Sequence, residues 1–458
     1  MNSSGIPNLP PQPTSITETG LSFGFLADLA LKILRHRGSM LGRDVADGLR
    51  LPFLGVTDKL LDWMRQERLV EIRGAEGGVE STYQYVITHA GDQRALELMD
   101  RNQYLGPAPV TLAAYIAMVE AQSIKGHTIT FDSLKSGLSH LVLNADIIER
   151  LGLAVTAGQS IFLFGNTGDG KTSIGLALGQ LLPGAIWIPY AVMVEGQIIK
   201  VFDAGRHRPV AKKTSSESAS VRRGLLNYLT REKNDGVEVI IGIGDDERYD
   251  ERWTLIHRPL IVGGGEMTLK HLELLYDPTT KYYEAPQQMK ANGGVFLLDD
   301  LGRQQTSPRA LLNRWIVPLD KRVDYMTLAT GYKFQIPFDV LVIFATNLTP
   351  IDIADESFLR RIRHKIHIPD PSWDEFCEIF KREAAKRAIP YSDSGMQYLF
   401  DEYYMKLKRE PRGVHPRDLL DAIIEIARFQ GCSPTLSNEL IDLACQAYFI
   451  KNNRAEFA

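Results

Sequence analysis

GNTGDGKT, the stretch Gly165–Thr172, lies between an apolar run, Ile161–Phe164, and a segment with helical patterning, Ser173–Leu182. A strand, a glycine-rich loop, a Lys-Thr pair and a helix in this order predict a phosphate-binding P-loop at a parallel sheet. A plain glycine turn is the alternative interpretation, and the flanking strand and helix disfavour it. The stretch therefore predicts an α/β fold organised around a polyphosphate site.

Each residue type in the loop suits a part of that chemistry. Gly165, Gly168 and Gly170 permit the positive φ angles and the close backbone approach that phosphates require. We expect Lys171 to reach the β- and γ-phosphates of ATP and the Thr172 hydroxyl to hold Mg²⁺. The residues predicted to bind the nucleotide are Gly165, Asn166, Thr167, Gly168, Asp169, Gly170, Lys171, Thr172 and Ser173.

The composition is that of an ordinary globular protein. The chain has 458 residues, of which 44% are hydrophobic and 24% charged, and its net charge of −4 creates no global attraction for nucleic acid or anionic membrane. No apolar run approaches the ~20 residues of a membrane helix, and the N-terminus lacks the features of a secretory signal. The three cysteines, Cys377, Cys432 and Cys445, have no metal-binding spacing and are expected to be reduced. We therefore expect a cytoplasmic protein without membrane insertion.

The N-terminal part is predicted to hold a disordered tail, 1–20, and a winged-helix-like domain, 21–103. Three helical segments followed by a hairpin carry the second prediction: Phe23–His36, Arg43–Leu49, Thr57–Glu67, Leu69–Arg73 and Thr82–Thr88. DNA binding and protein docking both remain open for such a domain. Because the third helix mixes acidic Asp58 and Asp62 with basic Lys59 and Arg65, we favour a protein partner.

The remaining chain divides by composition and patterning. The predicted segments are a linker with one helix (104–128), an α/β core (129–368) with a charged insertion at about 205–252, and an all-helical lid (369–458).

A second element of the site follows the core strand Val295–Leu298, which ends in Asp299-Asp300. This is a Walker-B pattern, in which a buried strand delivers one carboxylate to Mg²⁺ and a second to the attacking water. We assign Asp299 to the metal and Asp300 to the water. A helix N-cap is the alternative, since Ser307-Pro308 begins a helix downstream. Glu is more usual at the second position, so the shorter Asp300 predicts slow turnover.

Polar and basic residues further along complete the predicted site. Asn347 follows the strand Val340–Phe344 and is suited to orienting the water or the γ-phosphate; the start of a turn at Thr349-Pro350 is the alternative. Arg360 and Arg361 belong to a basic cluster that would be stabilised by the γ-phosphate of a neighbouring subunit, unless it is simply a solvated face. Arg417, at the start of a lid helix, is placed to touch phosphate from above.

This order of elements resembles that of the AAA+ ATPases. The resemblance implies that Asn347 is sensor 1, that Arg361 or Arg360 is the arginine finger, and that Arg417 is sensor 2. The predicted hairpin Arg322–Ile336 resembles the pre-sensor-1 hairpin on the MoxR-like side of the superfamily. Four stretches are similar to a bacterial group described as ATPases with chaperone activity associated with Flp pilus assembly: WIPYAVMVEGQIIKVFD (187–203), YDPTTKYYEAPQQMKANGGVFLLDD (276–300), GRQQTSPRALLNRWIVPLDKRVDY (302–325) and ESFLRRIRHKIHIPDP (356–371).

The resemblance implies a ring-shaped homo-oligomer, often a hexamer, in which ATP hydrolysis remodels a protein partner. A chaperone-like role in pilus or secretion assembly is the first hypothesis. A DNA-acting or transcription-regulating ATPase that uses the winged helix is the second. A nucleotide-gated scaffold with weak hydrolysis is the third, and the Asp300 departure from the usual Glu keeps it open.

Overall fold

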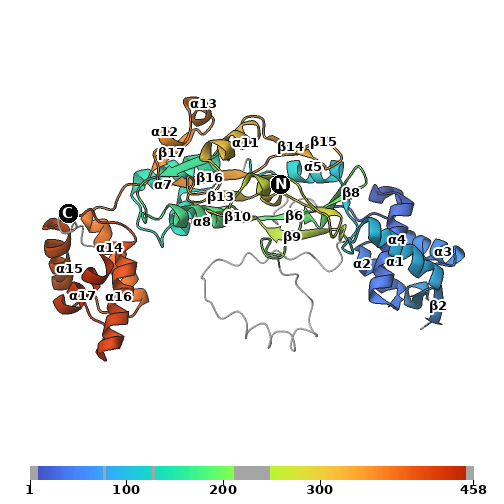
Figure 1. The fold of residues 1–458 in the computed structure, drawn as a ribbon, viewed down its shortest axis with the longest axis horizontal. Helices are drawn as coiled ribbons and strands as arrows, with labels where there is room; N and C mark the ends of the chain where they lie inside the picture. The colour runs from blue at the N-terminus through green and yellow to red at the C-terminus, as the bar shows by residue number, and fades with distance from the viewer. Residues whose placement is uncertain (1–8, 76–78, 126–128, 211–247, 450–458) are drawn as a thin grey trace, which may run out of the picture.

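The computed structural model describes residues 9–75, 79–125, 129–210 and 248–449. Figure 1 shows three parts in a row: N-terminal helices at one end, an α/β body in the middle and C-terminal helices at the other end. We call the C-terminal helices the lid after their predicted role, which stays a prediction.

The body is built on a five-stranded parallel sheet. Its strands, in spatial order, are β10 (Leu260–Gly263), β13 (Val295–Leu298), β16 (Leu341–Thr346), β5 (Ile161–Phe164) and β17 (His364–His367). The three middle strands are almost wholly buried, which explains their unbroken apolar sequences. The chain therefore has the predicted α/β fold with a parallel sheet.

Helices cover both faces of this sheet. Ile161 and Leu163 pack into one apolar cluster and Phe162 into another, because successive strand residues point to opposite faces. The first cluster involves α6 (Phe131–Gly137), α7 (Ala145–Thr156) and α8 (Lys171–Leu181). The second involves α11 (Pro308–Lys321), α12 (Pro350–Ile353) and α13 (Glu356–Leu359).

Smaller sheets extend the body toward the N-terminal part. A mixed sheet has the order β11 (Leu275–Asp277), β12 (Tyr282–Glu284), β8 (Gln197–Lys200), β7 (Ala191–Val194) and β4 (Val110–Thr111). Two antiparallel ribbons and one short helix also belong to the body. They are β6 (Ala185–Pro189) with β9 (Trp253–His257), β14 (Val323–Thr327) with β15 (Lys333–Pro337), and α10 (Gln287–Lys290).

Residues 104–125 of the segment predicted as a linker with one helix are part of the body, so the linker prediction was wrong for them; residues 126–128 lie outside the described part of the chain. Its strand β4 pairs with β7, and its helix α5 (Leu112–Ala121) places Tyr115 in the core. The Tyr115 hydroxyl accepts a hydrogen bond from Asn292 Nδ2 at 2.7 Å. Gln122 pairs with the backbone of Trp187 through both amide atoms. The Pro/Gly-rich stretch 104–110, which precedes α5, had indicated a domain boundary at this place.

The N-terminal part contains α1 (Phe23–Arg37), β1 (Met40–Leu41), α2 (Gly42–Leu49), α3 (Asp58–Gln66), β2 (Val70–Ala75), β3 (Tyr83–Ile87) and α4 (His89–Arg101). Its strands form an antiparallel sheet with β3 in the middle. Short helical turns lie at Thr17–Thr19, Phe53–Thr57 and Glu80–Thr82, and elsewhere at Leu269–Leu272 and Phe400–Met405. The winged-helix interpretation of this part stays a prediction.

Residues 9–20 are packed on the body, so the prediction of disorder was wrong for them. The Pro10 carbonyl accepts a hydrogen bond from Asp250 N at 2.9 Å, and the Thr19 carbonyl accepts one from Arg252 Nη1 at 2.9 Å. Arg252 is buried and ion-paired with Asp250, so it supplies an anchor that composition alone does not reveal.

The bounds 205–252 of the predicted insertion were too wide. Pro209 bridges to Ile256, and Arg252 is buried, so both ends of the segment belong to the folded body. Its middle, 211–247, lies outside the described residues.

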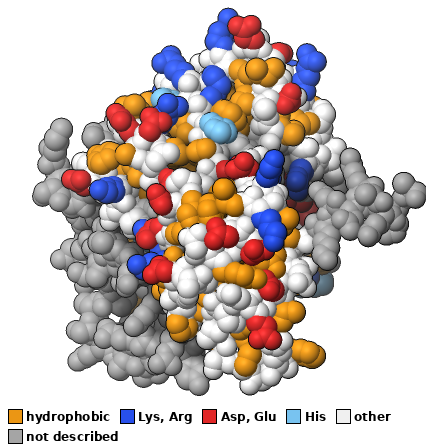
Figure 2. Space-filling model, turned by 90° about the vertical axis from the view of Figure 1, so that its left-hand side faces the viewer, with side chains coloured by type: hydrophobic (Ala, Val, Ile, Leu, Met, Phe, Trp, Pro, Cys, Tyr) orange, Lys and Arg blue, Asp and Glu red, His pale blue; other side chains and the backbone are white. Residues whose placement is uncertain are grey.

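The lid consists of α14 (Trp373–Lys386), α15 (Asp393–Leu399), α16 (His415–Gln430) and α17 (Asn438–Tyr448). These helices surround an apolar cluster of their own, which includes Phe376, Phe380 and Leu420. Figure 2 looks at this end of the molecule and shows hydrophobic, basic and acidic side chains interspersed on it. Across the described part of the chain, no helix is both long enough and apolar enough to cross a membrane.

Candidate nucleotide-binding site

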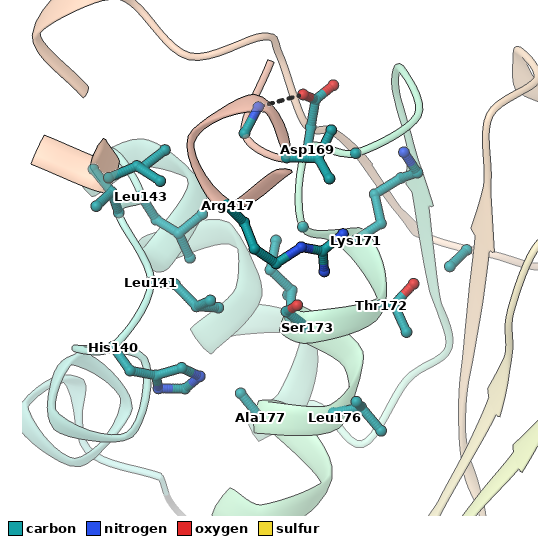
Figure 3. A pocket seen from close by; sticks show the side chains of 18 of the residues that line it. His140, Leu141, Leu143, Asp169, Lys171, Thr172, Ser173, Leu176, Ala177 and Arg417 are labelled. Atoms are coloured by element: carbon teal, nitrogen blue, oxygen red, sulfur yellow. Dashed lines mark hydrogen bonds between the residues drawn. The ribbon is translucent and has the colours of Figure 1, made fainter. Parts of the chain in front are cut away.

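A cavity of about 810 Å³ opens at the carboxyl edge of the parallel sheet. The P-loop, the ends of β13 and β16, a loop before α7 and the lid all contribute to its lining. Figure 3 shows Lys171, Thr172 and Ser173 on the first turn of α8, with Arg417 reaching toward them from the lid. The parallel sheet places these groups together because its strands all end at this edge.

The P-loop backbone has the conformation that its glycines predict. Gly165, Gly168 and Gly170 have φ angles of 152°, 94° and 86°. A Cβ atom at Gly165 would also lie 2.1 Å from the Ile368 carbonyl oxygen. Both the turn and the close contact with the segment after β17 therefore require glycine.

Lys171 is buried at the centre of the loop, with 6% of its surface exposed. Its Nζ donates to the Gly165 carbonyl at 3.1 Å and to the Asn166 carbonyl. Burial lowers the pKa of Lys171, and the nearby carboxylates of Asp169, Asp300 and Asp299 oppose that effect. The ammonium group is thus desolvated, so its attraction for an anionic ligand is less screened than at an exposed site, while the nearby carboxylates oppose that attraction.

Thr172 and Asp299 meet across the cavity floor. The Thr172 hydroxyl lies 2.9 and 3.0 Å from the two carboxylate oxygens of Asp299, although 127 residues separate them in sequence. A hydroxyl and a carboxylate at one point are oxygen ligands of the kind that Mg²⁺ prefers. The described residues contain no cluster of three or more His, Cys, Asp or Glu side chains suited to a metal. The pair therefore fits Mg²⁺ held by two protein groups together with substrate phosphates.

Asp300 and Asn347 line the same cavity. Asp300 is exposed and has a left-handed backbone, with a φ angle of 49°. Asn347 follows β16, which lies between β5 and β13, so its side chain is carried between the P-loop strand and the strand that delivers the carboxylates. The structure thus brings the predicted water-handling residues together.

The other predicted P-loop residues differ in what their side chains do. Thr167, Asp169 and Ser173 line the cavity. Asn166 instead donates from Nδ2 to Asp370 Oδ2 at 2.8 Å, so its side chain contacts the segment leading to the lid.

Arg417 lies on the lid side of the cavity, and its side chain is largely exposed to solvent. Its side chain is 59% exposed, and its Nε donates to Asp418 Oδ1 at 2.9 Å. That contact leaves the rest of the guanidinium free to approach a phosphate chain.

Arg360 and Arg361 do not line this cavity. Arg361 Nε is paired with Asp320 Oδ2 at 2.6 Å, and Arg361 Nη1 donates to the Ser357 carbonyl. Arg360 is exposed, and its guanidinium has no partner among the described residues. Of the two, Arg360 is the one available to another molecule.

Several lining residues were not predicted from the sequence. Arg382, Glu383 and Lys386 line the cavity from α14, as does Ile379. The spacing of Ile379, Arg382, Glu383 and Lys386 places them on one helix face, but nothing in the sequence directs that face to the P-loop. Arg382 Nη1 also donates to the Ser139 carbonyl at 2.6 Å, which joins the lid to the loop before α7.

The comparisons with known proteins give a family match for the lid alone. A model described as Domain of unknown function (DUF8689) matches residues 372–447. No curated protein matches the chain.

Solved structures resemble the chain only distantly. NtrX from Brucella abortus in complex with ADP has a TM-score of 0.37 and 14% identity, covering 67% of this chain and 56% of that chain. NtrX from Brucella abortus in complex with ATP has a TM-score of 0.36 and 13% identity, covering 64% and 54%. A point mutant of RuvB from Thermotoga maritima has a TM-score of 0.35 and 11% identity, covering 71% and 72%. The chain thus spans little more than half the length of NtrX.

Proposed function

We propose that this chain is an ATPase of the AAA+ type, which binds ATP with Mg²⁺ at the carboxyl edge of the parallel sheet and hydrolyses it. The contact between the Thr172 hydroxyl and the Asp299 carboxylate, beside the buried Lys171, is the observation that carries the proposal. These are the three groups that phosphoryl transfer in P-loop proteins requires.

Each residue has a defined part in the reaction. The P-loop backbone and Lys171 hold the β- and γ-phosphates, and Thr172 and Asp299 would hold Mg²⁺, which would neutralise part of the phosphate charge. Asp300 accepts a hydrogen bond from the attacking water, and Asn347 orients it. The water oxygen bonds to the γ-phosphorus as its proton passes to Asp300, the bond to the β–γ bridging oxygen breaks, and ADP leaves; the proton then passes from Asp300 to the released phosphate.

We further propose that a second copy of the chain completes the site. Arg360 is exposed, unpartnered among the described residues and absent from the lining of its own cavity, so it is suited to stabilising the γ-phosphate of a neighbour. This supports a ring-shaped homo-oligomer, with a hexamer as the expected form. Hydrolysis would then move subunits against one another and remodel a protein client, consistent with a chaperone-like role of the MoxR-like side in pilus or secretion assembly.

The charge on α3 makes a nucleic-acid substrate the less favoured alternative. Arg65, which a DNA-reading helix would direct to phosphate, is paired with Asp62 at 3.2 Å on the same helix. Salt-sensitive binding of duplex DNA by the full chain, lost in Arg65→Ala but not in Arg428→Ala on the lid, would reverse this preference.

Nucleotide binding and turnover by the full chain test the proposal directly. ATP should bind in the presence of Mg²⁺, and hydrolysis should stop when EDTA removes the metal. Asp300→Asn should retain ATP and lose at least about 100-fold in turnover, because a neutral amide cannot accept the proton of the water. Unchanged turnover would exclude this role for Asp300, while the absence of turnover in the unaltered chain, with ATP bound, would favour a scaffold. A client would then be captured on Asp300→Asn with ATP and identified by mass spectrometry.

A further inference from the structure

The P-loop and the lid meet at a group of polar contacts that the catalytic steps do not use. Asp370, in the segment between β17 and α14, accepts a hydrogen bond from Asn166 Nδ2 at 2.8 Å. Asp169 Oδ1 accepts one from Gly413 N, just before α16, at 3.3 Å, and Figure 3 shows this contact. Val414 packs against Gly168 so closely that a Cβ atom there would lie 2.5 Å from Val414 Cγ1. The tip of the P-loop is therefore held both by the segment that enters the lid and by the start of α16.

Two oxygen atoms at this junction are buried and have no hydrogen-bond partner. They are Asp169 Oδ2 and Asp370 Oδ1, the remaining oxygens of the two carboxyl groups. A buried carboxylate oxygen without a donor is costly, and the negative charges of Asp169 and Asp370 also act on each other. One proton held between them would give each oxygen a partner and remove one of the two negative charges.

We propose that Asp370 is a positioning residue that shares one proton with Asp169, and that this acid–carboxylate pair couples the lid to the charge of the P-loop. The coupling concerns the nucleotide site described above and therefore rests on the proposed function. Asp370 acts through Asp169 and Asn166 and does not line the cavity itself.

The electrostatic surroundings agree with a shared proton. Burial raises the pKa of Asp169 to about 7; the Gly413 N–H opposes this, and the charge and hydrogen bond of Asp370 add to it. The positive charge of Lys171 on the P-loop favours the ionised form of Asp169 and therefore acts to lower its pKa. On α16, burial lowers the pKa of His415 to about 4, so this imidazole stays neutral where the pair titrates. Glu375 of α14 faces the same region and is held by the Ser372 N–H.

The sign of the effect on ATP follows from linkage. Bound phosphates add negative charge near Asp169 and raise its pKa further, so ATP binding is accompanied by proton uptake above pH 7. ATP affinity should accordingly fall as the pH rises through that range. For an additional rise of about one pKa unit the dissociation constant increases by up to about tenfold.

The test is a titration of the full chain with Mg²⁺ and ATP between pH 6 and 8.5, performed on Asp370→Asn and on a matched control, Asp374→Asn. Asp374 is an exposed carboxylate four residues further on, at the start of α14. The unaltered chain and Asp374→Asn should bind ATP about three- to tenfold more weakly at pH 8.5 than at pH 6. In Asp370→Asn the amide donates a hydrogen bond to Asp169 and lowers the pKa of Asp169. The ratio of ATP affinities at pH 6 and pH 8.5 should therefore approach the ratio found for Asp169→Asn. The ionisation of ATP itself is common to all variants and cancels in the comparison.

Each outcome has a distinct meaning. Equal pH profiles in Asp370→Asn and Asp374→Asn would overturn the shared proton, even with ATP bound normally. If the unaltered chain bound no ATP at any pH, the proposed function would fail instead. Calorimetry of ATP binding at pH 7.5 in two buffers of different ionisation enthalpy gives a readout on the unaltered chain. Proton uptake no greater than in Asp169→Asn would also refute the pair.

Discussion

The two walls of the nucleotide cavity are built in different ways. On the core wall, Lys171 is buried, and Thr172 and Asp299 contact each other at the carboxyl edge of the parallel sheet, where β13 pairs with β16. On the lid wall, Arg417 has a 59% exposed side chain and lies on a helix that belongs to a separate apolar cluster. The geometry of the core wall follows from the pairing of strands within one sheet. The geometry of the lid wall depends in addition on the position of the lid relative to that sheet.

This difference indicates a division of work. The groups of the core wall are carried by paired strands and contact one another, which suits them to the proposed binding of phosphates and metal. The lid wall is joined to the core by a few polar contacts, including Arg382 with Ser139 and Asp370 with Asn166. Small changes at those contacts can therefore alter access to the nucleotide without disturbing the catalytic groups.

Lys171→Ala is expected to have the largest effect, since it removes the cation of the core wall. ATP affinity should fall by at least about 100-fold, because the phosphates lose a buried charge-assisted hydrogen bond. Isothermal titration calorimetry measures this, and Lys59→Ala, on the exposed surface of α3, is the control. Unaltered affinity in Lys171→Ala would refute the role of the P-loop.

Arginine substitutions test whether a neighbouring subunit contributes an arginine to the nucleotide cavity. Arg360→Ala should reduce turnover by about 10²–10³-fold and leave ATP binding intact, as loss of a finger in trans does. Arg361→Ala should have a smaller effect on turnover, because Arg361 already pairs with Asp320.

Mixed rings distinguish a contribution in trans from one within the subunit. Arg360→Ala mixed with Asp300→Asn restores some sites that carry both an intact finger and an intact Asp300. Turnover in the mixture should exceed that of either variant alone. A mixture as inactive as its components, or a stronger defect in Arg361→Ala, would contradict the assignment to Arg360.

Arg417→Ala should have a moderate effect, because the lid wall adds to a site that the core wall already forms. We expect about a tenfold loss in turnover, in the range of one exposed charged hydrogen bond to a phosphate. Steady-state ATPase assays measure it, with Arg428→Ala at the other end of α16 as control. A loss as large as that of Lys171→Ala would break the distinction between the walls.

The smallest effect is expected on the pH dependence of stability, through Asp169, where the P-loop contacts the lid. Because the folded-state pKa of Asp169 is about 7 against an ordinary 3.8, the native chain binds more protons than the unfolded chain between these values. The stability contributed by this group is thus present below pH 4 and lost as the pH rises to 7. Relative to the unaltered chain, Asp169→Asn should gain about 1–3 °C in thermal midpoint from pH 4 to pH 8. A difference between the two chains that does not change with pH would contradict the raised pKa.

Local patterns predicted the parts of this molecule that depend on neighbours in sequence. The apolar runs Ile161–Phe164 and Val295–Leu298 form strands, and the glycines of the loop adopt positive φ angles. The packing of residues 9–20 and 104–125 on the body was missed, since their anchors, such as Arg252 and Asn292, come from distant segments. The lid residue Arg382 was missed for the same reason.

The sequence by itself determined which residues are candidates to bind phosphate and metal, because strand, loop and helix periodicity and the chemistry of Lys, Thr and Asp are local properties. The tertiary structure decided which of them meet. It placed Thr172 beside Asp299 through parallel strand pairing, tied Arg361 to Asp320 while leaving Arg360 exposed, and brought Asp370 against the P-loop. Such contacts join residues 41 to 204 positions apart, and only packing selects them.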